Sequence, residues 1–214
     1  MFGLPLAFLA SMACIRWLDL PAATWIHRHG LDTYPWMLQF LSAPILIAPG
    51  AALFLVVHAI RRGYGRGGQV ERAYAVIAAT LLVALAVKDM LKRAFGRTWP
   101  RNVVDPGPEA ISSGCSPSSL GYINDGLHGF HAFAGVTKPY QAFPSGSTVV
   151  LLATVLPLMA LYPRLRLPLA IFSLVSFCAY VLTNTHFIGD VVAGAYVGAV
   201  AGMIATATIR SGRP

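Results

Sequence analysis

The sequence predicts an all-α integral membrane protein with six transmembrane helices, on the basis of its composition and the spacing of its apolar runs. Of its 214 residues, 56% are hydrophobic and only 11% are charged, which is about half the charged fraction of an ordinary soluble domain. The mean hydropathy of +0.64 points the same way. A chain of this length is one domain, so we expect a single transmembrane domain over residues 1–214.

The predicted spans are six apolar runs, at residues 2–18, 44–60, 73–87, 148–162, 167–182 and 191–209. Several are shorter than the ~20 residues that cross a bilayer, but flanking Trp, Tyr, Lys and Arg residues complete them at the interfaces. The first run has no basic region before it and no small-residue cleavage site, so we interpret it as a retained span. Residues 19–44 follow, where Trp25, Tyr34 and Trp36 predict an interfacial helix.

One long polar stretch, residues 93–144, forms a loop between the third and fourth predicted spans. A loop of this length inside a compact domain is often functional. Six spans place both termini on one side of the membrane, with the arginine-rich gaps after the second and fourth runs. Basic residues number eight on each side, but six of those on the other side cluster around the long loop. We therefore predict that the side holding Arg61 is cytoplasmic and that the loop faces outward.

The net charge of +8 comes from 16 basic and 8 acidic residues. The basic residues lie in short gaps between apolar runs, which favours membrane orientation, anionic headgroups or phosphate over nucleic acid. The three cysteines do not have a metal-ligand spacing. We expect membrane lipids as partners and neither nucleic acid, metal nor cofactor, and the oligomeric state stays open.

Three polar clusters are predicted to emerge on the same membrane face. The first is KDMLKRAFGRTWPR, residues 88–101. Lys88 and Lys92 lie one helical turn apart on one face, and Arg97 and Arg101 follow in a turn. An interfacial helix end explains two or three basic residues, but this cluster has more than anchoring requires.

The second cluster, FPSGS at residues 143–147, predicts a helix start capped by Ser145. The free amides and the positive dipole end of such a helix hold anions, although Ser and Gly begin many helices for structural reasons alone. The third cluster, TNTHFIGDVVAG at residues 183–194, places His186 and Asp190 on one helix face. The carboxylate can accept the Nδ1 proton and leave Nε2 as a nucleophile. A purely structural hydrogen-bonded pair is the alternative.

Cations, a helix N-terminus and an oriented imidazole on one face suit attack on a phosphate ester. The order and spacing of the clusters resemble the type 2 phosphatidic acid phosphatase superfamily over residues 75–205. The family has Lys, six residues and Arg-Pro; then Pro-Ser-Gly-His; then Ser-Arg, five residues, His, three residues and Asp. The matching residues here are Lys92, Pro100, Pro144, Ser145, Gly146, His186 and Asp190.

The resemblance implies a six-helix membrane fold in which His186 is the nucleophile and Asp190 orients it. It also implies that Lys92 and the amides around Ser145 and Gly146 hold the phosphate. The candidates for phosphate binding are Lys92, Arg97, Ser145, Gly146 and Ser147.

The chain departs from the family pattern at three places. Trp99 stands for the first-motif Arg, Ala179 and Tyr180 stand for Ser-Arg, and Ser147 stands for the second-motif His. That His protonates the leaving oxygen in the family, and general acid help is worth roughly 10²–10⁴-fold. A lipid diphosphate suffers less from its loss, because its leaving group is already a stable phosphate anion.

Residues elsewhere are candidates to replace the lost groups. Arg97 and Arg101 can restore positive charge, and His128 and His131 in the long loop can supply an acid. Packing at the interface explains the two histidines equally well. A further alternative is that Ser147 is an inactivating substitution.

We therefore expect an integral membrane lipid phosphatase or phosphotransferase that works through a phosphohistidine. We place it in a bacterial inner membrane, with the active site facing the periplasm. Undecaprenyl diphosphate, phosphatidylglycerol phosphate, phosphatidic acid and lipid A phosphate all fit as substrates. The alternative is a catalytically impaired member of the family that binds or translocates lipid phosphates.

Overall fold

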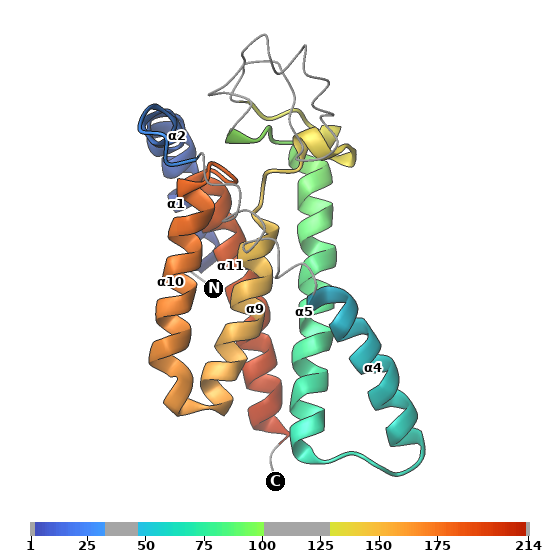
Figure 1. Cartoon of the computed structure of the whole chain (residues 1–214). Helices are drawn as coiled ribbons and strands as arrows, with labels where there is room; N and C mark the ends of the chain where they lie inside the picture. The colour runs from blue at the N-terminus through green and yellow to red at the C-terminus, as the bar shows by residue number, and fades with distance from the viewer. Residues whose placement is uncertain (1–2, 33–46, 101–128, 213–214) are drawn as a thin grey trace.

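The computed structural model describes residues 3–32, 47–100 and 129–212. Within these ranges the chain is helical apart from short connections and isolated bridges, which confirms the all-α prediction (Figure 1). The main helices are α1 (Gly3–Ala13), α2 (Asp19–Arg28), α4 (Ile47–Gly63), α5 (Gln69–Phe95), α9 (Gly146–Leu161), α10 (Arg166–Leu182) and α11 (Ile188–Ser211).

Each of the six apolar runs contains a helix, and four helical segments are long and apolar enough to cross a membrane. These are Gly3–Arg28, Gln69–Phe95, Pro163–Leu182 and Ile188–Ser211. The apolar helix α9 is shorter, and α4 begins directly after residues that are not described. The four long helices of the described residues indicate a membrane protein. That the chain crosses the membrane six times stays a prediction.

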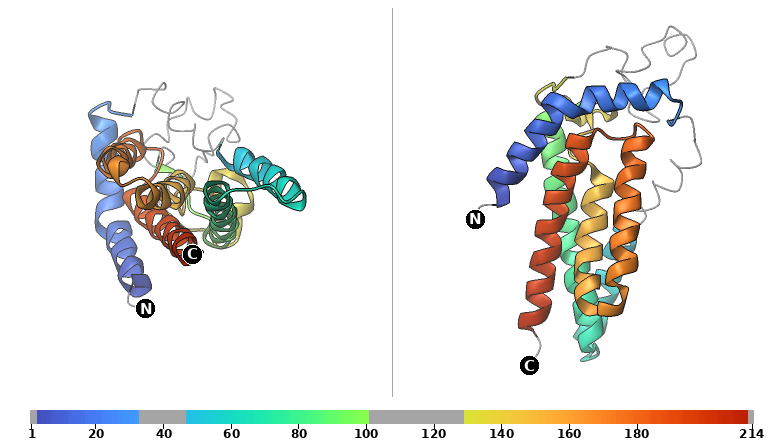
Figure 2. Two further views of the ribbon diagram at one scale, coloured as in Figure 1. Left: turned by 90° about the horizontal axis from the view of Figure 1, so that it is seen from below. Right: turned by 90° about the vertical axis from the view of Figure 1, so that its left-hand side faces the viewer.

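The N-terminal segment bends instead of running straight along the bundle. A π-helical turn, Cys14–Leu18, joins α1 to α2. Beyond this turn α2 lies across the end of the other helices (Figure 2). This is the region in which the sequence predicts an interfacial helix, although Tyr34 and Trp36 lie outside the described residues. The bend brings Asp19, the first residue of α2, to the end of the bundle where the three polar clusters meet.

The closest packing in the fold is between α9 and α11. Gly194, Gly198 and Gly202 lie at intervals of four on α11. A Cβ atom at these positions would come within 2.5, 2.6 and 2.7 Å of backbone carbonyl oxygens of α9 and its N-cap. Because only glycine allows so close an approach, this stripe fixes the start of α11 beside the start of α9. The core between them also includes Leu81 and Ala84 of α5.

The long loop begins later than its predicted boundary, because α5 continues through its charged residues to Phe95. Gly96 then ends the helix in the left-handed conformation, with φ of 57°. Further along the chain, residues 129–145 pack against the end of α5. A Cβ atom on Gly135 would lie 1.7 Å from the Lys92 carbonyl oxygen. This return segment therefore covers the last turn of α5.

Candidate active site

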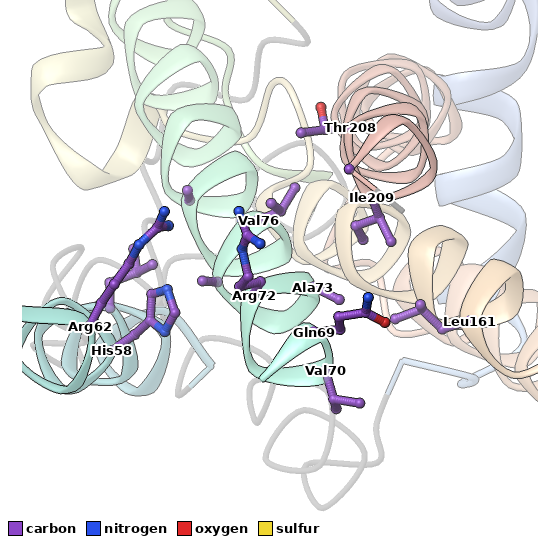
Figure 3. Close-up of a pocket in the computed structure, with 14 residues that line it drawn as sticks. His58, Arg62, Gln69, Val70, Arg72, Ala73, Val76, Leu161, Thr208 and Ile209 are labelled. Carbon is purple, nitrogen blue, oxygen red and sulfur yellow. The ribbon is translucent and has the colours of Figure 1, made fainter. Parts of the chain in front are cut away.

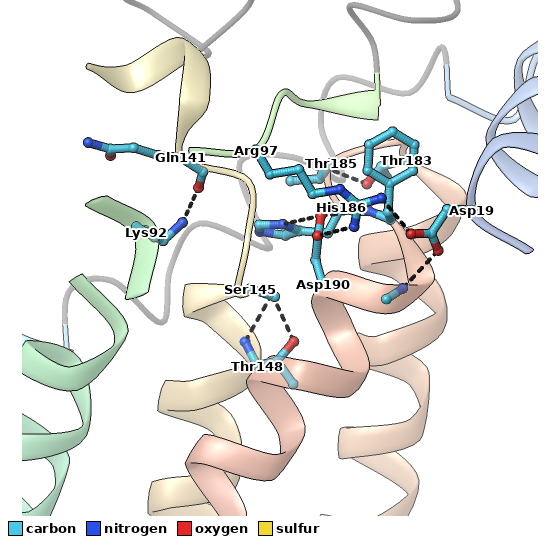
Figure 4. Close-up of polar contacts among 12 residues, drawn as sticks. Asp19, Lys92, Arg97, Gln141, Ser145, Thr148, Thr183, Thr185, His186 and Asp190 are labelled. Carbon is cyan, nitrogen blue, oxygen red and sulfur yellow. Dashed lines mark hydrogen bonds and ion pairs between the residues drawn. The ribbon is translucent and has the colours of Figure 1, made fainter. Parts of the chain in front are cut away.

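His186 and Asp190 lie at the turn from α10 into α11, and both are buried. The His186 Nδ1 atom is 3.6 Å from Asp190 Oδ2 (Figure 4). The same carboxylate oxygen accepts a hydrogen bond of 3.0 Å from the Phe187 amide and so caps α11. The cap fixes the carboxylate on the Nδ1 side of the imidazole.

The start of α9 is joined directly to this turn. The Ser145 amide donates to the Asp190 carbonyl at 3.0 Å. The Ser145 Oγ atom accepts from the Thr148 amide at 3.4 Å and from the Thr148 hydroxyl at 2.9 Å. Ser145 is thus the predicted N-cap, and its bond to the Asp190 carbonyl places the start of α9 against the start of α11. The second and third clusters of the sequence are in contact.

Two lysines of α5 line the other side of this helix start. Lys92 is buried, its ammonium contacts the Gln141 carbonyl, and its Nζ atom lies 5.4 Å from the centre of the Trp99 ring. The Trp99 ring lies in turn 5.1 Å from the His186 ring. Lys88 approaches Gly146, because a Cβ atom there would come within 3.7 Å of its Nζ. The two lysines share one face, as their spacing predicts.

Arg97, a phosphate-binding candidate because of its charge, is paired with carboxylates in the structure. Its side chain is fully buried, and one guanidinium nitrogen donates to Asp190 Oδ1 at 2.5 Å. Another donates to Asp19 Oδ2 at 2.6 Å. The guanidinium lies between the rings of Phe130 and Phe187. The positive charge of Arg97 is therefore already balanced by two carboxylates. The three ionised groups together carry a net charge of −1.

Asp19 is the residue of this site that the sequence analysis missed. Besides Arg97, it accepts a 2.8 Å hydrogen bond from the Gly189 amide. A Cβ atom on Gly189 would lie 2.9 Å from an Asp19 carboxylate oxygen and 2.7 Å from Ile15, so glycine is required for this approach. The available signal was an acidic residue at the edge of an apolar run, which carries a functional expectation in membrane proteins.

The N-terminal segment makes a second contact with the same turn through Asn184. Its side-chain amide donates to Asp32 Oδ2 at 2.9 Å and to the Ala23 carbonyl at 3.2 Å. Asn184 itself has a φ of 51°, a conformation that asparagine adopts more readily than most residues. The turn that carries His186 is thus held from α2 as well as from α9.

Two of the residues that replace family residues also lie together. The Tyr180 hydroxyl lies near Ser147, and Tyr180 is almost fully buried. His131 packs edge-to-face on Tyr140 and donates its backbone amide to Gly96, so it belongs to the segment that covers the end of α5. Arg101 and His128 lie outside the described residues.

The surroundings of His186 favour its neutral form. Burial lowers the pKa of the imidazole below its ordinary value of 6.5, and this outweighs the opposing effect of the Asp190 carboxylate. A neutral imidazole has a free nitrogen lone pair, which nucleophilic attack requires. Among the described residues, no group of three or more His, Cys, Asp or Glu side chains has the arrangement of a metal site.

Comparison with known proteins gives one match. A family model described as the PAP2 superfamily matches residues 73–212. This region holds all three polar clusters but not Asp19. No curated protein and no solved structure gives a significant match.

Proposed function

The chain belongs to the PAP2 superfamily, and we propose that it is an integral membrane phosphatase or phosphotransferase acting on a lipid phosphate. The observation that carries this proposal is the contact between the three clusters. The Asp190 carbonyl accepts from the Ser145 amide, and the Trp99 ring lies 5.4 Å from Lys92 Nζ and 5.1 Å from the His186 ring. A nucleophile, a cation and a helix N-terminus thus lie close together at one end of the bundle.

In the proposed reaction, His186 Nε2 attacks the terminal phosphorus of the lipid. A P–N bond forms while the bond from phosphorus to the leaving oxygen breaks, and Asp190 accepts the Nδ1 proton in a hydrogen bond. Water then attacks the phosphohistidine, the P–N bond breaks, and inorganic phosphate leaves as the imidazole is restored. A hydroxyl or phosphate of a second lipid takes the place of water if the enzyme is a transferase.

Lys92 and the first amides of α9 are the proposed phosphate ligands. The ammonium and the helix N-terminus both favour the negative charge of the phosphoryl oxygens. Lys92 contacts the Gln141 carbonyl in the structure, which uses one of the three N–H donors of the ammonium. The other two donors are the ones proposed to bind phosphoryl oxygens. Lys88 also lies beside Gly146, where its ammonium is paired with Asp89 at 2.6 Å.

The proposed substrate class is lipid diphosphates, because the site lacks the family's general acid. Ser147 has the Tyr180 hydroxyl as its neighbour, and neither hydroxyl is an effective acid at neutral pH. An alcohol leaving group would lose roughly 10²–10⁴-fold without protonation. When the terminal phosphate of a diphosphate is attacked, the leaving group is the lipid monophosphate. This anion can leave without being protonated, so the absence of a general acid slows the reaction less.

A lipid-phosphate binding or translocating protein is the second candidate. Trp99 and Tyr180 replace the two arginines of the family motifs, and Ser147 replaces the histidine. These replacements favour a binding protein, because the remaining cations can bind phosphate without turnover. The buried His186–Asp190 pair favours the enzyme, since simple binding does not need an oriented imidazole.

Phosphate release by the purified protein in detergent tests the proposal. Lipid monophosphates and diphosphates are compared on the parent chain, on His186→Ala and on His29→Ala, a matched control at an exposed histidine outside the site. We expect release from diphosphates that disappears in His186→Ala and persists in His29→Ala. Release that persists in His186→Ala contradicts the mechanism. Lipid binding that depends on Lys92 without any release supports the binding protein instead.

A further inference from the structure

A cavity that the catalytic proposal does not use lies at the opposite end of the bundle. It has a volume of about 560 Å³ and lies between α4 and α5, reaching the ends of α9 and α11 (Figure 3). Its size falls within the range of ligand pockets, roughly 300–1,000 Å³. Its walls are mainly apolar side chains. They include Leu55 of α4 and Ala75, Val76 and Ala79 of α5.

Two arginines from facing helices border this cavity. Arg62 comes from the last turn of α4 and Arg72 from the first turn of α5 (Figure 3). Across the described ranges, neither forms an ion pair with a carboxylate. The nearby Glu71 is already shared by His58 at 2.9 Å and Arg61 at 3.3 Å. The cavity therefore combines an apolar wall with two cations whose charge no described carboxylate balances.

The cavity and the candidate active site lie too far apart to serve one ligand. Arg72 and Lys92 are both on α5, and a helix rises 1.5 Å per residue. Their positions are therefore about 30 Å apart along the axis, which equals the thickness of the hydrocarbon core of a bilayer. A lipid whose headgroup meets Arg72 belongs to the leaflet opposite the one that meets Lys92.

We propose that this cavity binds an anionic phosphodiester lipid, with its phosphate between Arg62 and Arg72 and one acyl chain along the apolar wall. The charge and the shape argue for this occupant together. Basic pockets between transmembrane helices bind anionic headgroups, and Val76 and Ala79 continue the wall from Arg72 toward the membrane interior. Gln69 lies at the cavity rim as a neutral hydrogen-bonding group for the headgroup. The site is independent of the proposed catalytic function.

Native mass spectrometry of the intact protein in detergent tests this site. The probes are phosphatidylglycerol, the zwitterionic phosphatidylethanolamine and inorganic phosphate. The double variant Arg62→Gln/Arg72→Gln is compared with the control Arg66→Gln/Arg164→Gln. The control removes the same charge from exposed positions that do not line the cavity.

We expect one phosphatidylglycerol that binds more tightly than phosphatidylethanolamine. Its affinity should fall about tenfold or more in the Arg62/Arg72 variant and by less than about twofold in the control, because each cation near a headgroup contributes on the order of 1 kcal/mol. Equal losses in the two double variants, or no preference for the anionic lipid, would overturn the proposal. Inorganic phosphate that displaces the lipid would show a site for soluble anions instead.

A second variant tests the acyl-chain wall without changing charge. Ala79→Trp places a large side chain on an exposed wall position, where it can be added without disturbing the core. We expect phosphatidylglycerol binding to weaken by about tenfold, as the loss of much of the chain's apolar contact predicts. Unchanged binding in a variant with the parent's thermal unfolding temperature would contradict the placement of the chain.

Discussion

A charged side chain with two partners of the opposite type lies near each end of α5. The central residue is an arginine at one end and a glutamate at the other, and the two networks differ greatly in burial. At the end beside the candidate active site, Arg97 lies between Asp19 and Asp190, at 2.6 and 2.5 Å, and all three side chains are fully buried. At the other end, Glu71 lies between His58 and Arg61, at 2.9 and 3.3 Å. There the Arg61 side chain is 53% exposed and that of Glu71 18%.

Burial, more than the number of contacts, decides what each network does. In the network around Glu71, water reaches the Arg61 side chain and can replace it as a partner, so this contact contributes little. In the buried network a lost partner leaves a charge without compensation, which is strongly destabilising. The buried network also joins parts of the chain that are far apart in sequence: the start of α2, the end of α5 and the start of α11. We infer that it holds Asp190, and with it His186, in position.

The largest effect is expected from Arg97→Met, which leaves two carboxylates buried without a cation. We expect the free energy of unfolding to fall by about 3–5 kcal/mol, measured by denaturant titration in detergent. Phosphate release should be lost as well, since Asp190 would no longer be held. A loss below about 1 kcal/mol would show that the two ends of α5 do not differ as described.

Asp19→Asn should have a smaller effect, because the amide keeps the shape and one acceptor oxygen while the charge is lost. We expect a destabilisation of about 1–3 kcal/mol and a fall in kcat with little change in KM, since Asp19 does not face the substrate. Steady-state kinetics with a lipid diphosphate measure this split. An unchanged kcat would remove Asp19 from the positioning of the site.

A smaller effect again is expected from pH, through His186. Its pKa lies below 6.5 in the folded protein, so the unfolded chain binds the proton at higher pH than the folded one. The contribution of His186 to stability should therefore decrease as pH falls below 6.5 and level off below the native pKa. NMR titration of the histidine ring, assigned with His186→Gln, measures the midpoint directly. A midpoint at or above 6.5 contradicts the expectation.

The smallest effect is expected from Glu71→Gln at the exposed end. It removes a charge with two partners, as Arg97→Met does, but water reaches the site. We expect the free energy of unfolding to change far less than it does in Arg97→Met, and phosphate release to stay unchanged. A loss as large as that of Arg97→Met would mean that burial does not explain the comparison.

The helices were predictable from the sequence because apolar runs report them directly, but their ends were not. The third run was predicted at residues 73–87, whereas α5 extends over Gln69–Phe95. Charged residues interrupt an apolar run but do not end a helix. Helix α5 therefore continues past the apolar run until Gly96 ends it. The glycine spacing of four on α11 was a further signal, visible in the sequence, that α11 packs against another helix.

The site was predictable where its residues are spaced along one helix, as for Lys88 with Lys92 and His186 with Asp190. The pairing of Arg97 with Asp19 was not, because it depends on a bend that brings together residues 78 positions apart. The sequence analysis assigned Arg97 to phosphate from its charge alone. Its surroundings, two buried carboxylates, follow only from the tertiary structure.

Trapping the covalent intermediate tests the central claim, that His186 is the nucleophile, most directly. The purified protein is mixed with a lipid diphosphate labelled in its terminal phosphate and stopped in alkaline denaturant, where phosphohistidine is stable. The labelled peptide is then mapped. We predict an acid-labile label on the peptide that contains His186, and no label in His186→Ala. Phosphate release by a protein that carries no label, or a label on another residue, would contradict the account.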